Sequence, residues 1–300
     1  MPPSGSPTVR RRRLAAELRR LRGNRTGTGV SRAIGWSPTK ISRAESGRES
    51  LPPPEVEKLL DYYGVAEPYR GQLLGLAQDA IQRGWWDDYA DVLAPEYLEF
   101  IGLEAEATSI AAWHSDIVPG LLQTADYAKQ ISVGYQSVIP TPPSVVEQVV
   151  RVRMTRQERL TRRPVLQLSA VIDEAVLLRR IGDRELMREQ LRHLARMADL
   201  PNVDLRVLPL DRNSPVIALP FEILSFGSWD AGNARISLGD VVNIESFKSD
   251  LYIEGETDTY MFRVLFDALA RAALSREATR VLLINTAQRV WACSLWPSYL

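Results

Sequence analysis

Along the first eighty residues apolar side chains recur every three or four positions, and this period predicts a series of short amphipathic helices. Proline and glycine between the apolar groups mark the breaks. The five predicted helices begin near Val9, Thr26, Pro38, Pro53 and Pro68. Five short helices, with the second and third joined by a tight turn, are typical of a small all-helical domain built around a helix-turn-helix.

The stretch from Gly35 to Gly47 holds the predicted turn and third helix. Gly35 can adopt the positive φ that ends a helix, Ser37 is a good N-cap, and Pro38 suits the first helical position. Ile41 and Ala44 can then pack inward. Four side chains on the remaining surface could reach base edges in a DNA major groove: Thr39, Lys40, Ser42 and Arg43. The spacing alone also fits an ordinary amphipathic surface helix.

Charge is distributed unevenly along a chain whose formal net charge is zero. Residues 1–50 hold eleven Arg and one Lys against three Glu, so they carry +9 and the remaining residues carry −9. A basic cluster can be only a solvated face. Because four arginines in a row (10–13) precede the predicted helix-turn-helix, we favour a footprint on DNA phosphates. The predicted phosphate contacts are Arg11, Arg13, Arg32 and Ser37.

This N-terminal region resembles the lambda-repressor-like, XRE-type helix-turn-helix domains, and the text GWSPTKISRAESGR resembles the variant common in actinomycete regulators. The resemblance implies a DNA-binding domain whose third helix reads the operator. The sequence departs from the family at Thr26-Gly27-Thr28-Gly29, where a good helix former is usual. Each interior Gly costs roughly 0.5–1 kcal/mol against Ala. We therefore expect a weak second helix that is only partly formed without DNA.

Beyond residue 83 the hydrophobic period alternates between that of helices and that of strands. The predicted strands cover 109–114, 165–172, 203–208, 221–226, 241–245 and 251–254, with helices between them that do not alternate strictly. This order predicts an α+β domain around one mixed sheet. The expected organisation is a disordered start (1–8), a helix-turn-helix domain (9–82), an α+β effector- or partner-binding domain (83–291) and a tail (292–300).

The segment from Tyr97 to about Arg289 resembles the shared C-terminal domain of a group of actinomycete regulators described as antitoxin-like. The texts LEAEA (103–107), VPGLLQT (118–124) and DYA (126–128) carry the resemblance. It implies an XRE-type reader joined to this domain, with a small partner protein often encoded by a neighbouring gene.

The residues proposed for an effector or partner are Trp85, Trp86, Leu121, Leu122, Gln123 and Tyr127. The two tryptophans could instead anchor the two domains, since paired Trp residues bury large areas. The Leu-Leu segment could equally be a tight turn that packs into the core.

Candidate chemistry is sparse. His114 lies beside Ser115 and Asp116, but neighbours along a strand cannot form a catalytic triad, and the sequence has no nucleophile elbow, phosphate loop or zinc-type cluster. Cys293 is the single cysteine. No apolar run is long enough for a membrane span, and Met1–Pro7 lacks the apolar core of a signal peptide. We expect no catalytic residues, cofactor or metal, and a cytoplasmic location.

Together these features predict a sequence-specific transcriptional regulator that binds double-stranded DNA as a homodimer. Its C-terminal domain would sense a small partner protein or ligand. The alternative is an enzyme that acts on a small molecule, with an appended DNA-binding module. A polar cavity with converging titratable groups would favour the enzyme, and an apolar surface patch would favour a partner.

Overall fold

The computed structural model describes residues 7–47, 49–227, 229–231, 234–236, 239–245 and 250–291. Contacts divide the chain into two compact units. Unit 1 comprises Met1–Ala90, Tyr97–Glu106 and Phe226–Gly239, and unit 2 comprises Asp91–Glu96, Ala107–Ser225 and Asp240–Leu300. The division therefore differs from the predicted boundary between residues 82 and 83, because two later segments join the N-terminal helices.

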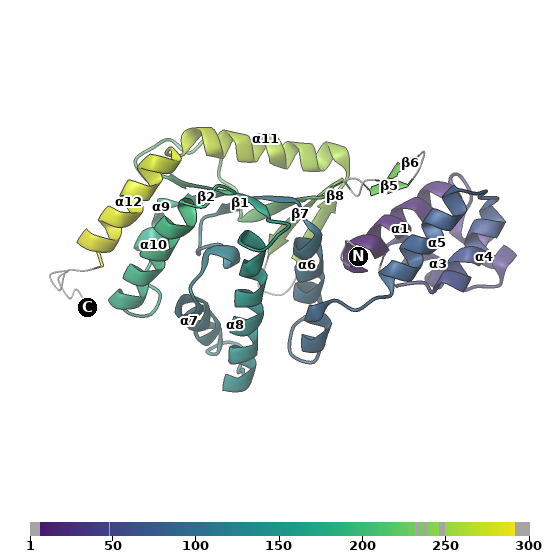
Figure 1. Cartoon of the computed structure of the whole chain (residues 1–300), viewed down its shortest axis with the longest axis horizontal. Coiled ribbons are helices and arrows are strands. Elements are labelled where there is room, and N and C mark those ends of the chain that lie inside the picture. Colours follow the sequence, from purple (N-terminus) through teal and green to yellow (C-terminus); the bar gives the residue numbers. More distant parts are fainter. Residues whose placement is uncertain are drawn as a thin grey trace. The chain divides into compact units, whose positions relative to one another are not determined.

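Unit 1 contains the five predicted helices (Figure 1). They are α1 (Pro7–Arg22), α2 (Gly27–Ile34), α3 (Pro38–Glu45), α4 (Pro53–Tyr63) and α5 (Tyr69–Ala80), followed by the 3₁₀ turn η1 (Trp85–Tyr89) and α6 (Pro95–Glu106). One core holds the five together, including Leu14, Leu18, Val30, Ile41, Val56, Leu60 and Leu73. These residues are apolar positions of the 3.6-residue period, so local patterning accounts for this core.

Unit 2 is built on a six-stranded mixed sheet of order β3-β2-β1-β4-β7-β8. Its strands are β1 (Ser109–His114), β2 (Gln167–Asp173), β3 (Val203–Leu208), β4 (Phe221–Ser225), β7 (Asp240–Glu245) and β8 (Asp250–Glu254). β1, β2 and β3 run parallel, while β4, β7 and β8 join by antiparallel pairing. The predicted mixed sheet and the α-then-α+β fold class are confirmed. A separate two-stranded ribbon that belongs to unit 1, β5 (Trp229–Ala231) and β6 (Ala234–Ile236), was not predicted.

Helices lie against both sides of this sheet (Figure 1). They are α7 (Ala125–Tyr135), α8 (Pro143–Gln157), α9 (Glu174–Leu178), α10 (Arg184–Ala198), α11 (Glu256–Ala272) and α12 (Arg276–Arg289), with 3₁₀ turns η2 (Gly120–Leu122) and η3 (Glu158–Leu160). α11 packs on one face through a cluster that includes Trp113, Phe221, Val242, Phe266 and Leu269. Among the described residues, no helix combines the length and apolar character needed to cross a membrane.

Some element ends differ from the prediction. α1 begins at Pro7 rather than near Val9, so Pro7 and Thr8 belong to a helix instead of the expected disordered start. The sequence predicts Thr257 as the cap of the helix that ends near Ala273, but α11 begins at Glu256 and Gly255 occupies the N-cap position. Residues 1–6 and the expected tail from 292 lie outside the described residues.

Candidate nucleic-acid interface

The turn between α2 and α3 has the geometry that its residue types predict. Gly35 adopts φ +71° and ψ +33°, and its N–H donates to the Ser31 carbonyl, which ends α2. Ser37 then caps α3, since its hydroxyl accepts from the Lys40 N–H at 3.2 Å. Pro38 occupies the first turn of α3, where its missing N–H has no helical partner to lose.

One face of α3 packs into the core and sets which face is left outside. Ile41 and Ala44 are buried, in the same cluster as Val30 and Ile34 of α2. The small side chain of Ser31 is also buried, and its hydroxyl donates to the Thr28 carbonyl at 3.0 Å. The two helices are therefore held by apolar packing, which leaves Thr39, Ser42 and Arg43 on the outer face of α3.

Three of the four predicted base-reading residues are exposed on this outer face: Thr39, Ser42 and Arg43. The Arg43 guanidinium has no hydrogen-bond or ion-pair partner among the described residues. Two hydroxyls and a guanidinium on one exposed helix face can donate to base edges, and Arg suits guanine O6 and N7 in particular.

Lys40, the fourth predicted base-reading residue, is half-buried and already paired. Its Nζ lies 2.6 Å from Oε1 of Glu55 on α4 and 4.5 Å from the centroid of the Trp36 ring. Both contacts hold the ammonium group beside the turn. A base contact would therefore compete with this ion pair and cation–π contact.

The predicted phosphate contacts fall into two groups. Arg32 at the end of α2 and Ser37 at the start of α3 are exposed beside the turn. Arg32 has no side-chain partner in the described part of the chain. These two placements suit a phosphate contact.

The arginine run of α1 is directed largely into unit 1. Arg10 is 4% exposed and pairs with Asp79 of α5 at 3.0 Å, while Arg12 donates to Glu99 of α6 at 2.7 Å. Arg13 is 6% exposed, and its Nη2 donates to the Gly227 carbonyl at 2.7 Å. The prediction that Arg13 holds a DNA phosphate does not fit this placement, because its guanidinium is enclosed and bonded. Nothing in the local sequence revealed these distant partners.

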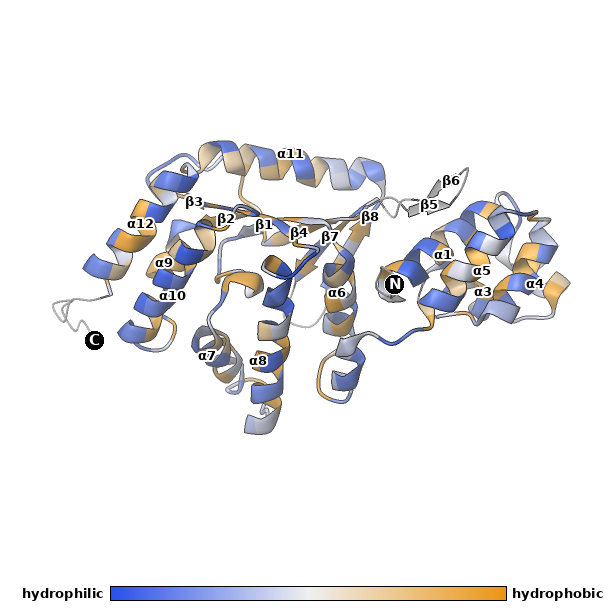
Figure 2. Cartoon of the chain, in the orientation of Figure 1, coloured by the Kyte–Doolittle hydropathy of each residue, from blue (hydrophilic) through white to orange (hydrophobic). Residues whose placement is uncertain are grey.

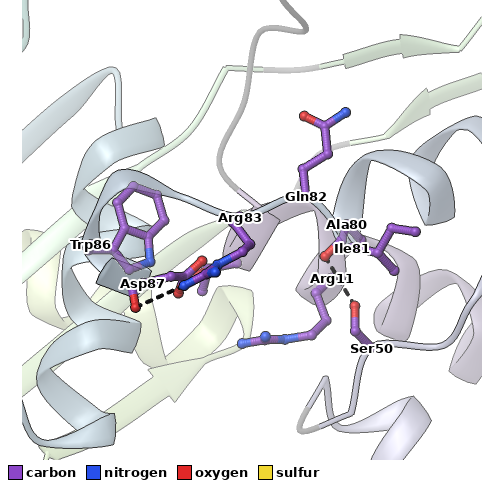
Figure 3. Close-up of a pocket in the computed structure, with 9 residues that line it drawn as sticks. Arg11, Ser50, Ala80, Ile81, Gln82, Arg83, Trp86 and Asp87 are labelled. Carbon is purple, nitrogen blue, oxygen red and sulfur yellow. Dashed lines mark hydrogen bonds between the residues drawn. The ribbon is translucent and has the colours of Figure 1, made fainter. Parts of the chain in front are cut away.

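Arg11 lines a cavity of about 310 Å³ in unit 1 (Figure 3). The other lining residues are Thr8, Ser50, Ala80, Ile81, Gln82, Arg83, Trp86 and Asp87, and no residue of α2 or α3 is among them. Burial lowers the pKa of the Arg11 guanidinium, and Glu99 and Asp87 partly offset that shift. Arg11 is thus beside a pocket of mixed polar and apolar lining rather than beside α3.

The two adjacent tryptophans have different surroundings. Trp86 is buried, lines this cavity and lies against Gly84, where an added Cβ would come within 2.3 Å of its ring. Trp85 is partly exposed, with its ring edge-on to that of Trp86 at 5.9 Å. The described contacts of Trp86 are with residues of unit 1, and its ring forms part of the pocket wall.

The VPGLLQT segment is a buried turn. Leu121, Leu122, Gln123 and Tyr127, all proposed for an effector or partner, are at most 4% exposed. The alternative interpretation, a tight turn that packs two Leu residues inward, therefore describes this segment.

Three polar side chains on neighbouring helices hold the turn in place. Gln190 of α10 donates to the Leu122 carbonyl and accepts from the Thr124 N–H, at 2.8 and 2.7 Å. Gln157 donates to two turn carbonyls, and Arg153 donates to the Gln123 side chain at 2.8 Å. Sequence reasoning missed this set, although a Gln among the buried positions of α10 was a usable signal.

His114 on β1 pairs with Glu222 on β4, Nε2 to Oε1 at 3.1 Å, because Glu222 lies opposite Ala112 on the neighbouring antiparallel strand. Asp116 is farther away, with its Oδ1 4.0 Å from Nδ1. Within the described ranges, no three His, Cys, Asp or Glu side chains form a group that could hold a metal ion.

Comparison with protein families agrees with this geometry. Residues 13–73 match a helix-turn-helix domain, so the class of protein is one that carries a DNA-binding helix-turn-helix. Residues 97–285 match a domain of unknown function, DUF5753, and the chain belongs to that family. No curated protein and no solved structure matches the chain significantly.

Proposed function

We propose that this chain is a sequence-specific transcriptional regulator of the XRE type that binds double-stranded DNA in the cytoplasm as a homodimer. The observation that carries the proposal is the outer face of α3, where Thr39, Ser42 and Arg43 are exposed while the opposite face packs into the core. A helix held in this way can enter a major groove without rearranging its own domain.

In this proposal the long side chain of Arg43 bonds a base edge, and the shorter side chains of Thr39 and Ser42 bond base edges beside it. Arg32 and Ser37 bond phosphates on either side of the turn and fix the register of the helix. Lys40 contributes to the field beside the groove while it stays paired to Glu55. A single helix-turn-helix contacts one short half-site, and a second copy supplies the other half.

We further propose that unit 2 receives a small partner protein, as the resemblance to antitoxin-like regulators of actinomycetes implies. Apolar side chains exposed on its surface at the end of α7 and just after it support this role, among them Tyr135, Val138 and Ile139. The enzyme alternative finds less support. The cavity of about 310 Å³ lies in unit 1 rather than in unit 2, and the Nε2 of His114 is paired to the Glu222 carboxylate.

The test uses the full chain and a library of random duplexes. Repeated selection should enrich one short motif, and Arg43→Ala should weaken binding to that motif while leaving affinity for random DNA nearly unchanged. The matched control is Arg162→Ala, which removes an exposed arginine of unit 2. Failure to enrich any motif, or equal losses on both DNAs for Arg43→Ala, would overturn sequence-specific reading by α3.

A further inference from the structure

The outer face of α11 is an apolar surface in the middle of a long helix. The inward residues Thr259, Phe266 and Leu269 are buried against the sheet. On the opposite face Tyr260 is 65%, Met261 64% and Val264 46% exposed. Figures 1 and 2 show α11 lying along its face of the sheet, with apolar and polar residues mixed along it.

These three side chains form one patch rather than scattered exceptions. Val264 follows Tyr260 by four residues and Met261 by three, so all three share a helix face. Ala268, four residues further on, extends the stripe with a small side chain. Single exposed apolar residues are ordinary, whereas a contiguous patch on a soluble surface marks an interaction site.

The two ends of the helix carry opposite charges. Glu256 and Asp258 lie in the first turn, and Arg271 lies in the last turn. All three are exposed, and none has a side-chain partner among the described residues. From one end to the other, the surface is therefore acidic, then apolar, then basic, with the exposed Asp267 between Val264 and Arg271.

We propose that this surface binds the α11 of a second copy of this chain, with the two helices antiparallel and Val264 on the two-fold axis. In such a pair, a residue that precedes Val264 by a given number of positions in one copy lies opposite the residue that follows Val264 by the same number in the other copy. Tyr260 then meets the small Ala268 of the second copy, so a large side chain faces a small one. Arg271 meets the level between Glu256 and Asp258 of the second copy.

This arrangement is self-complementary, as a two-fold interface requires, because the same patch serves both subunits. A parallel pair would instead place like charges together at both ends. The charge pattern thus selects the antiparallel orientation. The contact of one helix pair is small compared with a standard interface of about 1,600 Å², so we expect a reversible dimer. The inference gives a surface to the homodimer of the proposed function, and its test needs no DNA.

Cysteine crosslinking provides the sharpest test, since only a residue on a two-fold axis meets its own copy. The test protein is the full chain in which Cys293 is replaced by Ser, so that the native thiol is removed. Val264→Cys should then form a disulfide-linked dimer under mild oxidation, because packed helix axes 8–10 Å apart bring facing Cα atoms within disulfide reach. Val281→Cys is the matched control, a 55% exposed valine on α12, and should crosslink at least about tenfold more slowly.

Two further results bear on the orientation. Tyr260→Cys should crosslink slowly in the antiparallel pair, whereas fast crosslinking at both 260 and 264 would show a parallel pair and overturn the proposal. Equal crosslinking rates for Val264→Cys and Val281→Cys would show that any dimer interface does not lie on α11, which would overturn the proposal.

A charge exchange tests the ends of the interface independently of crosslinking. Arg271→Glu should shift the sedimenting species toward monomer, because it faces Glu256 and Asp258 of the second copy. Combining it with Glu256→Arg and Asp258→Arg reverses both ends and should restore the dimer. A wild-type chain that stays monomeric at all concentrations would contradict the inference, and so would a triple variant as dissociated as Arg271→Glu alone.

Discussion

Lys40 and Glu55 join the start of α3 to α4, with 2.6 Å between the ammonium nitrogen and a carboxylate oxygen. The Trp36 ring lies under the same ammonium group at 4.5 Å. The lysine therefore stabilises the turn in addition to any contact with DNA. Such a half-exposed pair contributes at most about 1 kcal/mol to folding, so DNA can compete for the lysine.

Arg43→Ala should reduce the difference in binding free energy between the preferred motif and random DNA by about 1–3 kcal/mol. We expect Lys40→Ala to reduce this difference by less. In a Glu55→Gln background, the lysine no longer has its ion-pair partner, and Lys40→Ala should then weaken DNA binding more than it does in the wild type. Binding titrations of the wild type, Lys40→Ala, Glu55→Gln and the double variant measure this coupling. Equal penalties in both backgrounds would show that Glu55 does not restrain Lys40.

The placement of Arg11 and Arg32 predicts different salt dependence. Arg32→Ala should reduce the slope of log affinity against log salt by about one, since one phosphate contact is lost. Arg11→Gln should leave the slope unchanged, because Arg11 lines the pocket with Trp86. Titrations of the full chain at several salt concentrations compare the two. A reduced slope for Arg11→Gln would restore the phosphate role predicted from the sequence.

Gly29 is the point where the structure changes the prediction for α2. Helix propensity alone favours Ala over Gly at position 29, but the added Cβ would lie 2.9 Å from the Thr26 hydroxyl. That hydroxyl caps α2 by accepting the Gly29 N–H at 3.1 Å. The gain of about 0.5–1 kcal/mol in helix propensity is thus offset by damage to a cap worth about 1 kcal/mol.

We therefore expect Gly29→Ala to leave the thermal midpoint unchanged or lower. In a Thr26→Ala background the hydroxyl is absent, and the same substitution should then stabilise by about 0.5–1 kcal/mol. Gly27→Ala is the control, because its Cβ would meet Ile41 at an ordinary 3.9 Å. Stabilisation by Gly29→Ala in both backgrounds would show that the cap adjusts without cost.

Asp250 on β8 predicts a pH dependence of stability. Burial first, and then the nearby carboxylates of Glu245, Glu96 and Glu222, raise the pKa of Asp250 to about 6, while a hydrogen bond with Tyr252 opposes the shift. Because the folded pKa exceeds the unfolded value of about 3.9, the group stabilises the fold below the unfolded pKa. That contribution is lost as the pH rises through about 6.

Asp250→Asn should accordingly stabilise the full chain at pH 7.5 by about 1 kcal/mol, after allowance for solvent screening of a half-buried group. The gain should shrink as the pH falls from 7 to 4. Thermal melts across this range measure it, with the exposed Asp211→Asn as control. An equal gain at pH 4 and pH 7.5 would exclude titration of Asp250 as the cause.

Local patterns predicted most helices and strands because each depends on neighbours in sequence. Gly35, Ser37 and Pro38 specify the turn by their own backbone preferences, and the apolar period of α10 predicts its buried face. Side-chain partners were not predictable in this way. Arg12 pairs with a residue 87 positions away, and Arg13 bonds a carbonyl 214 positions away. The sequence therefore predicted the positive charge of the arginine run but not the residues that its side chains contact.

These distant bonds have a consequence for synthesis of the protein. The five N-terminal helices leave the ribosome first, yet the Arg13 guanidinium must wait for Gly227, which is 214 residues later. At 5–20 residues per second the delay is about 10–40 s. During that interval the Arg13 guanidinium lacks the carbonyl that it bonds in the finished chain, and its N–H donors are available to other acceptors. The nascent helices can therefore attract polyanions that the completed protein no longer attracts so strongly.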